Sequence, residues 1–215
     1  MKSQCLISFG SNLGRRETII ADAARAVASS SLVDGMKASR LFETPPIGGP
    51  AGQEPFLNAV AAFETRASAR EILELLQQTE GRLGRTRDLR WDSRSIDLDV
   101  VLHGQLVGGT TGLIVPHPRY TARQFVLLPA CDVAAHYRDP RFGWDLQRLS
   151  RHLSEGLPSI ALIGGDEQMR HQLLMGLHQR HGIEVFHEHP DKAKLPVIAN
   201  APQARKPRPD ESPSQ

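Results

Sequence analysis

Apolar and polar positions alternate along the first 155 residues in blocks that predict strands and helices in turn. Strands are predicted at residues 5–9, 36–42, 56–65 and 96–101, and helices at residues 21–28 and 68–83. The resulting order is β-α-β-β-α-β. This order predicts an α+β fold in which an antiparallel sheet carries its helices on one face, the ferredoxin-like plan.

The second predicted helix has recognisable start and stop signals. Ser68 and Glu71 have the spacing of a capping box, and Gly84 follows the last apolar position. The apolar stripe consists of Ile72, Leu75, Leu76, Thr79 and Leu83. Gln77 and Glu80 lie on the flank of this stripe near the helix end, just before a polar loop.

The second half of the stretch at residues 85–101 carries a candidate metal site. Asp97 and Asp99 alternate with aliphatic residues, so both carboxylates lie on one face of the predicted strand. Two adjacent carboxylates repel each other unless a cation lies between them. Mg²⁺ prefers oxygen ligands, often one or two carboxylates together with substrate phosphates. The pattern indicates a magnesium site, although the solvated face of an ordinary strand can also read Asp-x-Asp.

The first half of the same stretch is a basic loop that also contains Trp91. Its arginines are Arg85, Arg87, Arg90 and Arg94. Guanidinium groups bind phosphate oxygens in a bidentate fork, so this loop is suited to the phosphates of a metal-bound nucleotide. A basic surface without a ligand has the same composition. The closeness of the loop to Asp97 and Asp99 favours a polyphosphate site.

Two further segments offer candidate ligand-binding residues. Residues 43–52 contain too much proline and glycine for a helix or a central strand, which predicts a long loop that is either functional or disordered. His117 lies between two prolines, which favour extended backbone. An isolated histidine is usually a structural hydrogen-bond donor, but Arg119 and Arg123 follow closely and favour a second phosphate-binding cluster.

The C-terminal part of the chain has a different pattern. Residues 156–189 predict a small β-α-β unit with parallel strands and a right-handed crossover. The Gly164-Gly165 turn could seat a phosphate, but the lysine and hydroxyl residue of a P-loop are missing. Five histidines between residues 171 and 189 do not have metal-ligand spacing. Residues 190–215 are rich in proline and charge, which predicts a disordered tail.

Composition sets broad limits on partners and compartment. The chain has 215 residues, of which 40% are hydrophobic and 23% charged, as in ordinary globular proteins. A net charge of +2 gives the whole surface no attraction to nucleic acid or membrane. Cys5 and Cys131 form no disulfide framework and favour a reducing compartment. The apolar run at residues 5–9 is too short for a signal peptide or a membrane span, so the sequence predicts a cytoplasmic protein.

Five ordered motifs within residues 1–155 resemble one protein family. They are Phe-Gly-Ser-Asn-Leu-Gly at 9–14, Glu-Thr-Pro-Pro at 43–46, Phe-Leu-Asn-Ala-Val at 56–60, Arg-Ser-Ile-Asp-Leu-Asp at 94–99, and Val-Pro-His-Pro-Arg at 115–119 with Arg-x-Phe-Val-Leu at 123–127. Each motif alone is weak, but the ordered set is specific. The chain is similar to 6-hydroxymethyl-7,8-dihydropterin pyrophosphokinases, enzymes of folate biosynthesis.

The resemblance implies transfer of a pyrophosphoryl group from ATP to the hydroxymethyl group of the pterin, with release of AMP. Two Mg²⁺ ions would be held by Asp97 and Asp99. The residues implied in catalysis are Arg85, Arg94, Asp97, Asp99, His117 and Arg123. Those implied near ATP are Gln77, Glu80, Arg85, Trp91, Arg94, His117 and Arg123. Those implied at the pterin are Thr44, Pro45, Phe56, Asn58 and Phe125, with the two phenylalanines stacking on its flat ring.

Some features depart from the family or leave an alternative open. Asp92 lies two residues before Arg94, where the family usually has Gly or Ala, and the extension after Leu157 is not part of the family core. That extension could be a docking or regulatory segment. The alternative function is a ferredoxin-like nucleic-acid-binding module that uses the basic loop, although only 5% of the residues are aromatic. The family resemblance implies small-molecule partners, no binding to nucleic acid or membrane, and a monomer or weak dimer.

Overall fold

The computed structural model describes residues 2–46, 52–84, 95–155, 159–162, 166–181, 184–186 and 197–200. The chain divides into two compact units, Met1–Ser154 and Glu155–Gln215. Each unit is described by itself. Among the helices of the described residues, none has both the length and the apolar content needed to cross a membrane.

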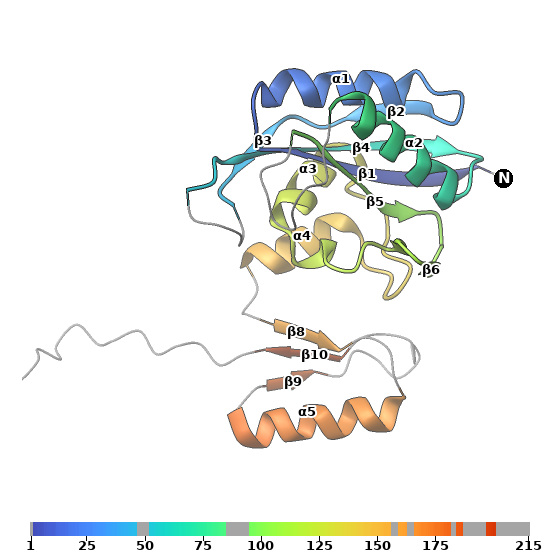
Figure 1. The fold of residues 1–215 in the computed structure, drawn as a ribbon. Coiled ribbons are helices and arrows are strands. Elements are labelled where there is room, and N and C mark those ends of the chain that lie inside the picture. The colour runs from blue at the N-terminus through green and yellow to red at the C-terminus, as the bar shows by residue number, and fades with distance from the viewer. Residues whose placement is uncertain are drawn as a thin grey trace, which may run out of the picture. The chain divides into compact units, whose positions relative to one another are not determined.

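The first unit is built on an antiparallel sheet with β1 (Ser3–Ser11) and β4 (Phe56–Thr65) at its centre (Figure 1). The strand order is β2-β4-β1-β5, and β3 also pairs with β4. The outer strands are β2 (Asp34–Ala38), β3 (Phe42–Thr44) and β5 (Asp97–His103). The prediction of an antiparallel sheet is confirmed, and β4 has the bounds that the sequence predicts.

The predicted strand at residues 36–42 is divided in two, so the prediction of one continuous strand is wrong. β2 ends at Ala38 and β3 begins at Phe42, and between them the residues 39–41 oppose only two residues of β4. An extra residue of this kind is a bulge, which bends the strand. The Ser39 hydroxyl accepts a hydrogen bond from a β4 amide at 3.0 Å, which replaces a bond of the ladder.

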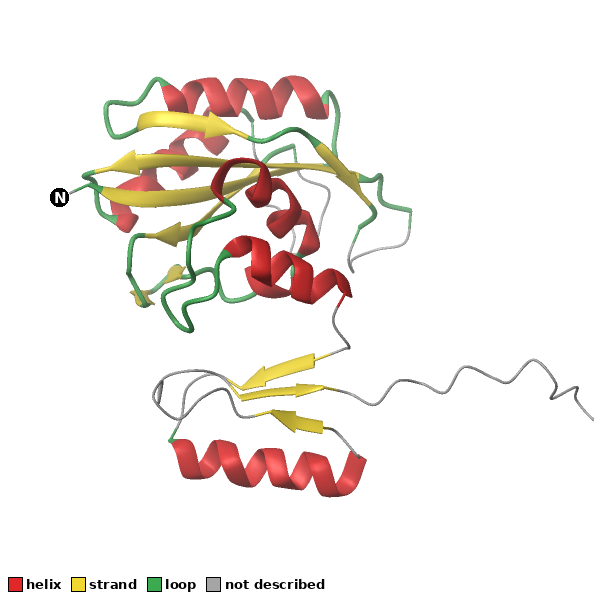
Figure 2. Cartoon of the chain, turned by 180° about the vertical axis from the view of Figure 1, so that it is seen from behind, coloured by secondary structure: helices red, strands yellow, loops and turns green. Residues whose placement is uncertain are grey.

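Helices cover both faces of this sheet, so the predicted arrangement with helices on one face is wrong (Figures 1 and 2). α1 (Arg16–Ala28) and α2 (Ala69–Arg82) lie on one face. α3 (Gln124–Ala134) packs on β4 from the other face, on which α4 (Leu146–Glu155) also lies. β4 shows why both faces are covered. Its residues 57–63 are all buried, and because side chains of a strand alternate between its faces, both faces of β4 must be shielded from solvent.

The start of α2 confirms the predicted capping box. The Ser68 hydroxyl accepts from the Glu71 amide, while the Glu71 carboxylate accepts from the Ser68 amide at 2.7 Å. Two donors at the helix start are thereby satisfied. The buried side chains of α2 pack with those of α1 against one face of β1, β4 and β5, and these elements form the main hydrophobic core.

The ends of several strands meet at one edge of the sheet and collect the candidate residues. β1 ends where β4 and β5 begin, since Ser11 pairs with Leu57 and Gly10 pairs with Asp97. β3 lies along the same end of β4. The elements between β5 and α3 are β6 (Gly108–Thr110), β7 (Leu113–Val115) and the short 3₁₀ helix η1 (Tyr120–Ala122).

The second unit contains a small sheet and one helix, namely β8 (Ser159–Leu162), α5 (Glu167–His181), β9 (Glu184–Phe186) and β10 (Val197–Asn200). β10 lies between β8 and β9 and is antiparallel to both, so β8 and β9 run parallel to each other. Because β10 falls within residues 190–215, the prediction of a disordered tail is wrong for this strand. The Gly164-Gly165 turn and the rest of that tail lie outside the described residues.

Candidate active site

The candidate metal ligands lie at the start of β5 on one of its faces. Asp97 and Asp99 are half-buried, whereas Ile96, Leu98 and Val100 are at most 4% exposed. The three aliphatic side chains belong to the core formed with α1 and α2. The two carboxylates therefore point to the opposite face of the sheet, and the predicted alternation is confirmed.

Two side chains from the segment before α3 approach Asp99. His117 Nε2 lies 3.8 Å from Asp99 Oδ2, and Arg123 Nη1 lies 3.9 Å from the same oxygen. Both distances exceed the hydrogen-bond range. The Asp99 side chain is 38% exposed, while those of His117 and Arg123 are 19% and 22% exposed. The three groups therefore face one another across a space that solvent reaches.

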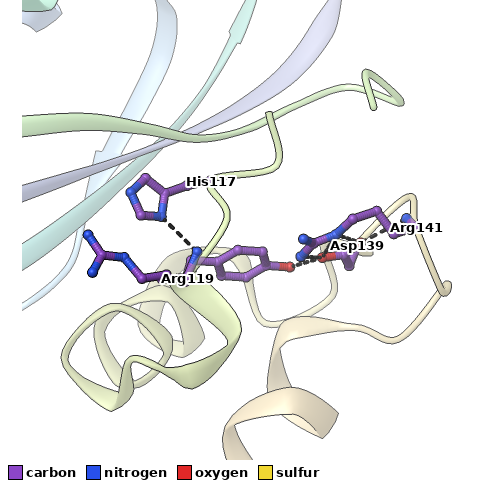
Figure 3. Close-up of polar contacts among 5 residues, drawn as sticks. His117, Arg119, Asp139 and Arg141 are labelled. Atoms are coloured by element: carbon purple, nitrogen blue, oxygen red, sulfur yellow. Dashed lines mark hydrogen bonds and ion pairs between the residues drawn. The ribbon is translucent and has the colours of Figure 1, made fainter. Parts of the chain in front are cut away.

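The His117 ring is neutral near pH 7. Burial lowers its pKa from 6.5 to about 4, and the charges of Arg123 and Arg119 add to this effect, while Asp97 opposes it. Its Nδ1 accepts a hydrogen bond from the Arg119 amide at 3.3 Å (Figure 3). Because Nδ1 is an acceptor, the neutral ring carries its proton on Nε2, the atom that faces Asp99. This tautomer can donate to an anionic oxygen.

Glu80 and Gln77, the two predicted ATP neighbours on α2, have different surroundings. Glu80 is 3% exposed, and its Oε1 accepts a hydrogen bond from the Leu98 amide at 2.8 Å. This bond joins α2 to β5 between the two candidate metal ligands, so Glu80 helps to fix their strand. Gln77 is exposed on α2. A contact of either residue with ATP stays a prediction.

The predicted pterin residues of β3 and β4 lie side by side. Asn58 is 4% exposed, and its Nδ2 donates to Thr44 Oγ1 at 2.9 Å. Phe56 is half-buried and pairs across the strands with Thr44. Pro45 follows β3 and is exposed. The Asn58 side chain is therefore held by a neighbour, which fixes the direction in which its amide can meet a ligand.

Phe125, the second predicted pterin aromatic, lies in the first turn of α3. Its ring is half-buried, and the Arg123 guanidinium lies 5.4 Å from the ring centroid. α3 packs on β4, the strand that Phe56 begins. One contact thus links the pterin residues to the cationic residues beside Asp99.

The predicted arginine loop is not part of this geometry. Arg85, Trp91 and Arg94 lie outside the described residues, as do Arg87, Arg90 and Asp92.

The structure adds residues near the site that the sequence patterns do not single out. Arg16 at the start of α1 donates to Pro55 O at 2.5 Å and to the Glu43 carboxylate at 2.9 Å, so it holds both flanks of the loop between β3 and β4. Tyr120 bonds to Asp139 in the connection between α3 and α4. These partners lie far apart in the sequence, and no periodic pattern marks them.

Several curated relatives of this chain carry the same name. A protein of Bacillus subtilis (strain 168) named 2-amino-4-hydroxy-6-hydroxymethyldihydropteridine pyrophosphokinase is 41% identical over 133 residues, which cover 62% of this chain and 79% of the relative. A protein of the same name from Pseudomonas aeruginosa is 38% identical over 167 residues, covering 76% and 96%. A protein of that name from Haemophilus influenzae is 33% identical over 129 residues, covering 60% and 80%.

Solved structures support the fold. The crystal structure of Plasmodium falciparum HPPK-DHPS wild type with pteroate superposes with a TM-score of 0.53 at 9% sequence identity and covers 92% of this chain. A triple mutant of that protein with pteroate gives a TM-score of 0.54 at 11% identity and covers 83%. This chain spans about half the length of each, 48% and 46%. At such low identity these matches are evidence for the fold alone.

A family model gives the assignment. Residues 6–135 match the model of 7,8-dihydro-6-hydroxymethylpterin-pyrophosphokinase (HPPK). This range contains most of β1 and all of β2 to β5, η1 and α3, and with them the carboxylates of β5 and the segment from His117 to Arg123. The chain belongs to the 7,8-dihydro-6-hydroxymethylpterin-pyrophosphokinase family.

Proposed function

We propose that this chain transfers the pyrophosphoryl group of ATP to 6-hydroxymethyl-7,8-dihydropterin. The hydroxymethyl oxygen forms a bond to the β-phosphorus of ATP, and the bond from that phosphorus to the oxygen shared with the α-phosphate breaks. AMP leaves with this oxygen, and the hydroxyl proton is released. One observation in particular supports the proposal: in a chain of this family, Asp97 and Asp99 share a face of β5 with His117 and Arg123 beside them.

The residues at the start of β5 fit Mg²⁺. Asp97 and Asp99 provide two half-exposed carboxylates on one face, and hard cations of this kind take further oxygens from phosphates and water. In the part of the chain that the structure describes, no group of three or more His, Cys, Asp or Glu has metal-binding geometry. In this proposal, phosphate and water oxygens supply further ligands. Two ions bound there would neutralise phosphate charge and orient the reacting oxygens.

His117 and Arg123 bind the phosphates of ATP in this proposal. Arg123 supplies a guanidinium that can form two hydrogen bonds to phosphate oxygens. His117 donates one hydrogen bond from Nε2 and stays neutral. Phosphoryl transfer requires positioning and charge stabilisation more than covalent help, which matches this set of groups.

The pterin lies between Phe56 and Phe125 in this proposal, and the polar edge of its ring meets Asn58. The Asn58 amide can donate and accept at one edge of the ring, and its bond to Thr44 holds it in place. Aromatic faces favour a flat ring system. The exposed Pro45, which follows β3, enters the pterin site in this proposal through the family resemblance.

Further residues enter the proposal through the family resemblance. Arg85, Arg94 and Trp91 extend the phosphate and nucleotide contacts, and Gln77 and Glu80 lie at the helix end beside them. If β2 and β3 are counted as one interrupted strand, the order of elements is β-α-β-β-α-β, and this order together with the sheet order β2-β4-β1-β5 supports the ferredoxin-like description of the core.

The remaining assignments concern the whole chain. We assign the enzyme to residues 1–155 and a small α/β unit to residues 156–200, because β10 is the central strand of the small sheet. A cytoplasmic location and a monomeric or weakly dimeric state stay predictions, and sedimentation of the full chain tests the latter.

An assay for AMP tests the proposal. The protein is incubated with 6-hydroxymethyl-7,8-dihydropterin, ATP and Mg²⁺, and the nucleotide products are separated. AMP that forms only when the pterin and Mg²⁺ are both present is the expected result. ADP, or nucleotide release that does not depend on the pterin, would contradict it. Thermal protection by an oligonucleotide, but not by a non-hydrolysable ATP analogue with Mg²⁺, would favour the nucleic-acid-binding alternative, which the family comparisons do not support.

A further inference from the structure

A buried hydrogen-bonded cluster lies beside the proposed site and outside the family motifs. The Tyr120 hydroxyl donates to Asp139 Oδ2 at 2.6 Å, and Arg141 Nη2 donates to the same oxygen at 2.5 Å (Figure 3). Arg141 Nε and the Arg141 amide also reach Asp139 Oδ1, at 3.0 and 2.8 Å. Both oxygens of the carboxylate are therefore occupied by partners within the protein.

Burial makes this cluster sensitive to small changes. Tyr120 and Asp139 are fully buried, and the Arg141 side chain is 12% exposed. The Arg141 guanidinium also lies 5.6 Å from the centroid of the Tyr120 ring. Burial and the nearby Asp139 charge raise the pKa of the Tyr120 hydroxyl, which keeps it a donor. A buried ionic group requires satisfied partners, so the three side chains depend on one another.

Backbone hydrogen bonds connect the cluster of Tyr120, Asp139 and Arg141, called the anchor cluster below, to the proposed site. The Tyr120 amide donates to His117 O at 3.2 Å, and Tyr120 O accepts from the Arg123 amide at 3.0 Å. Arg123 O in turn accepts from the first amides of α3. The Tyr120 residue thus lies at the centre of a turn whose two ends present His117 and Arg123 toward Asp99.

Asp139, the carboxylate of the anchor cluster, is fixed within the connection between α3 and α4. The Asp139 amide donates to Trp144 O at 2.9 Å, and Asp139 O accepts from the Gly143 amide at 2.7 Å. The Leu146 amide at the start of α4 donates to Tyr137 O at 2.9 Å. This connection forms a closed loop with its own hydrogen bonds, so it can serve as a fixed support for η1.

We propose that Tyr120, Asp139 and Arg141 are positioning residues for the pyrophosphoryl transfer, acting through the turn that presents His117 and Arg123 to the nucleotide phosphates. The inference rests on the proposed function. A misplacement of about 1 Å in a phosphate-binding group can lower the rate of such a reaction by roughly 10²-fold. The Tyr120–Asp139 bond limits the movement of the turn, and in this proposal neither residue contacts substrate.

The test removes one hydrogen bond and keeps the ring. Tyr120→Phe abolishes the bond to Asp139 and retains the aromatic contact with Arg141. We expect kcat/KM for ATP and the affinity for a non-hydrolysable ATP analogue each to fall about tenfold, since a hydrogen bond to a charged group orders the turn. The KM for the pterin is expected to change less than twofold. Tyr137→Phe, the same change in the α3–α4 connection, is the matched control and is expected to leave both constants unchanged.

A second background separates positioning from a loss of stability. In a protein that carries both His117→Gln and Arg123→Ala, we expect Tyr120→Phe to weaken binding of the ATP analogue less than twofold, because both groups that it positions are gone. An equal weakening in both backgrounds, or an effect no larger than that of Tyr137→Phe, would overturn the inference. If Tyr120→Phe does not fold, Arg141→Lys undergoes the same comparison. Absence of AMP formation by the unmodified chain would reject the proposed function instead, so the two failures are distinct.

Discussion

Two clusters of polar and charged residues share the turn from His117 to Arg123, and they are built differently. In the anchor cluster of Tyr120, Asp139 and Arg141, the carboxylate is fully buried, and its partners lie 2.5–3.1 Å away. In the phosphate-binding cluster that we propose, which consists of Asp99, His117 and Arg123, the carboxylate is 38% exposed, and the His117 and Arg123 nitrogens lie 3.8 and 3.9 Å from it.

The difference separates a fully buried carboxylate, bonded to Tyr120 and Arg141, from a partly exposed one that we propose binds a ligand. Withdrawing a charge from water is costly, and the anchor cluster offsets this with short hydrogen bonds to both carboxylate oxygens. The phosphate-binding cluster keeps its groups partly hydrated and beyond hydrogen-bond distance, so a bridging ion or phosphate can enter. Residue types alone do not distinguish the two, since each contains an Asp and an Arg.

The comparison predicts its largest effect at the carboxylates of β5. Asp97→Ala and Asp99→Ala should each lower kcat by roughly 10³-fold or more, because a lost metal ligand removes several kcal/mol of charge stabilisation. The midpoint of urea unfolding should change little, since both side chains are half-buried and lie outside the core. AMP formation and urea unfolding are measured on the same preparations.

Asp22→Ala is the control for these two variants. Asp22 forms an exposed pair with Arg25 on α1, and its loss should leave kcat unchanged. Near-normal turnover by Asp97→Ala or Asp99→Ala would remove the metal assignment and make the phosphate-binding cluster an ordinary surface.

The anchor cluster should show the opposite response. Asp139→Ala leaves the Arg141 charge buried without its carboxylate, which should lower the free energy of unfolding by about 3–5 kcal/mol. Asp132→Ala, which breaks a more exposed pair with Arg40, should cost at most about 1 kcal/mol. Urea unfolding measures both. If the two substitutions cost the same, burial would not be what distinguishes the clusters.

A smaller effect is expected from acid in the metal-free protein. Since the pKa of His117 is about 4 in the folded chain and 6.5 in its ordinary state, the unfolded state binds more protons between these values. Stability from this group is present above pH 6.5 and is lost as the pH falls toward 4, by at most about 3 kcal/mol.

His117→Gln isolates this contribution because the amide does not titrate. Unfolding in EDTA is followed across pH 4 to 7 for both proteins. The unmodified chain should lose stability more steeply than the variant over this window. Parallel curves would mean that the ring titrates normally and that its surroundings are less buried than the structure indicates.

The sequence predicted the order of elements well and the coverage of the sheet poorly. Strand alternation in β5 and the capping box of α2 are local signals, and both hold. Most residues of β4 are apolar, which favours burial on both faces, whereas the ferredoxin-like plan predicts helices on one face only. α3 is not predicted, because apolar residues occupy most of its positions and it contains Pro129, so it shows no distinct apolar stripe.

The site was predictable where it is local and not where it depends on distant contacts. Asp97 and Asp99 lie two residues apart, and the histidine and arginines follow in one motif. Tyr120 and Asp139 lie nineteen residues apart, with a helix between them, so only the folded chain brings them together. The burial of Glu80 also depends on a distant contact. The sequence places Glu80 on the flank of the apolar stripe, but it is buried in the structure because β5 packs beside α2 and the Leu98 amide donates to its carboxylate.

The smallest of the predicted effects tests whether the pterin side is independent of both clusters. Phe56→Ala should weaken binding of 6-hydroxymethyl-7,8-dihydropterin by about tenfold, since one aromatic face is lost. The affinity for the ATP analogue should change less than twofold, because the Phe56 neighbours are Thr44 and Asn58 on β3 and β4, not the groups around Asp99. Calorimetric titration with each ligand gives both constants. Weaker ATP binding with unchanged pterin binding would mean that the two pockets are exchanged. The carboxylates of β5 would then have to be assigned to a different part of the substrate.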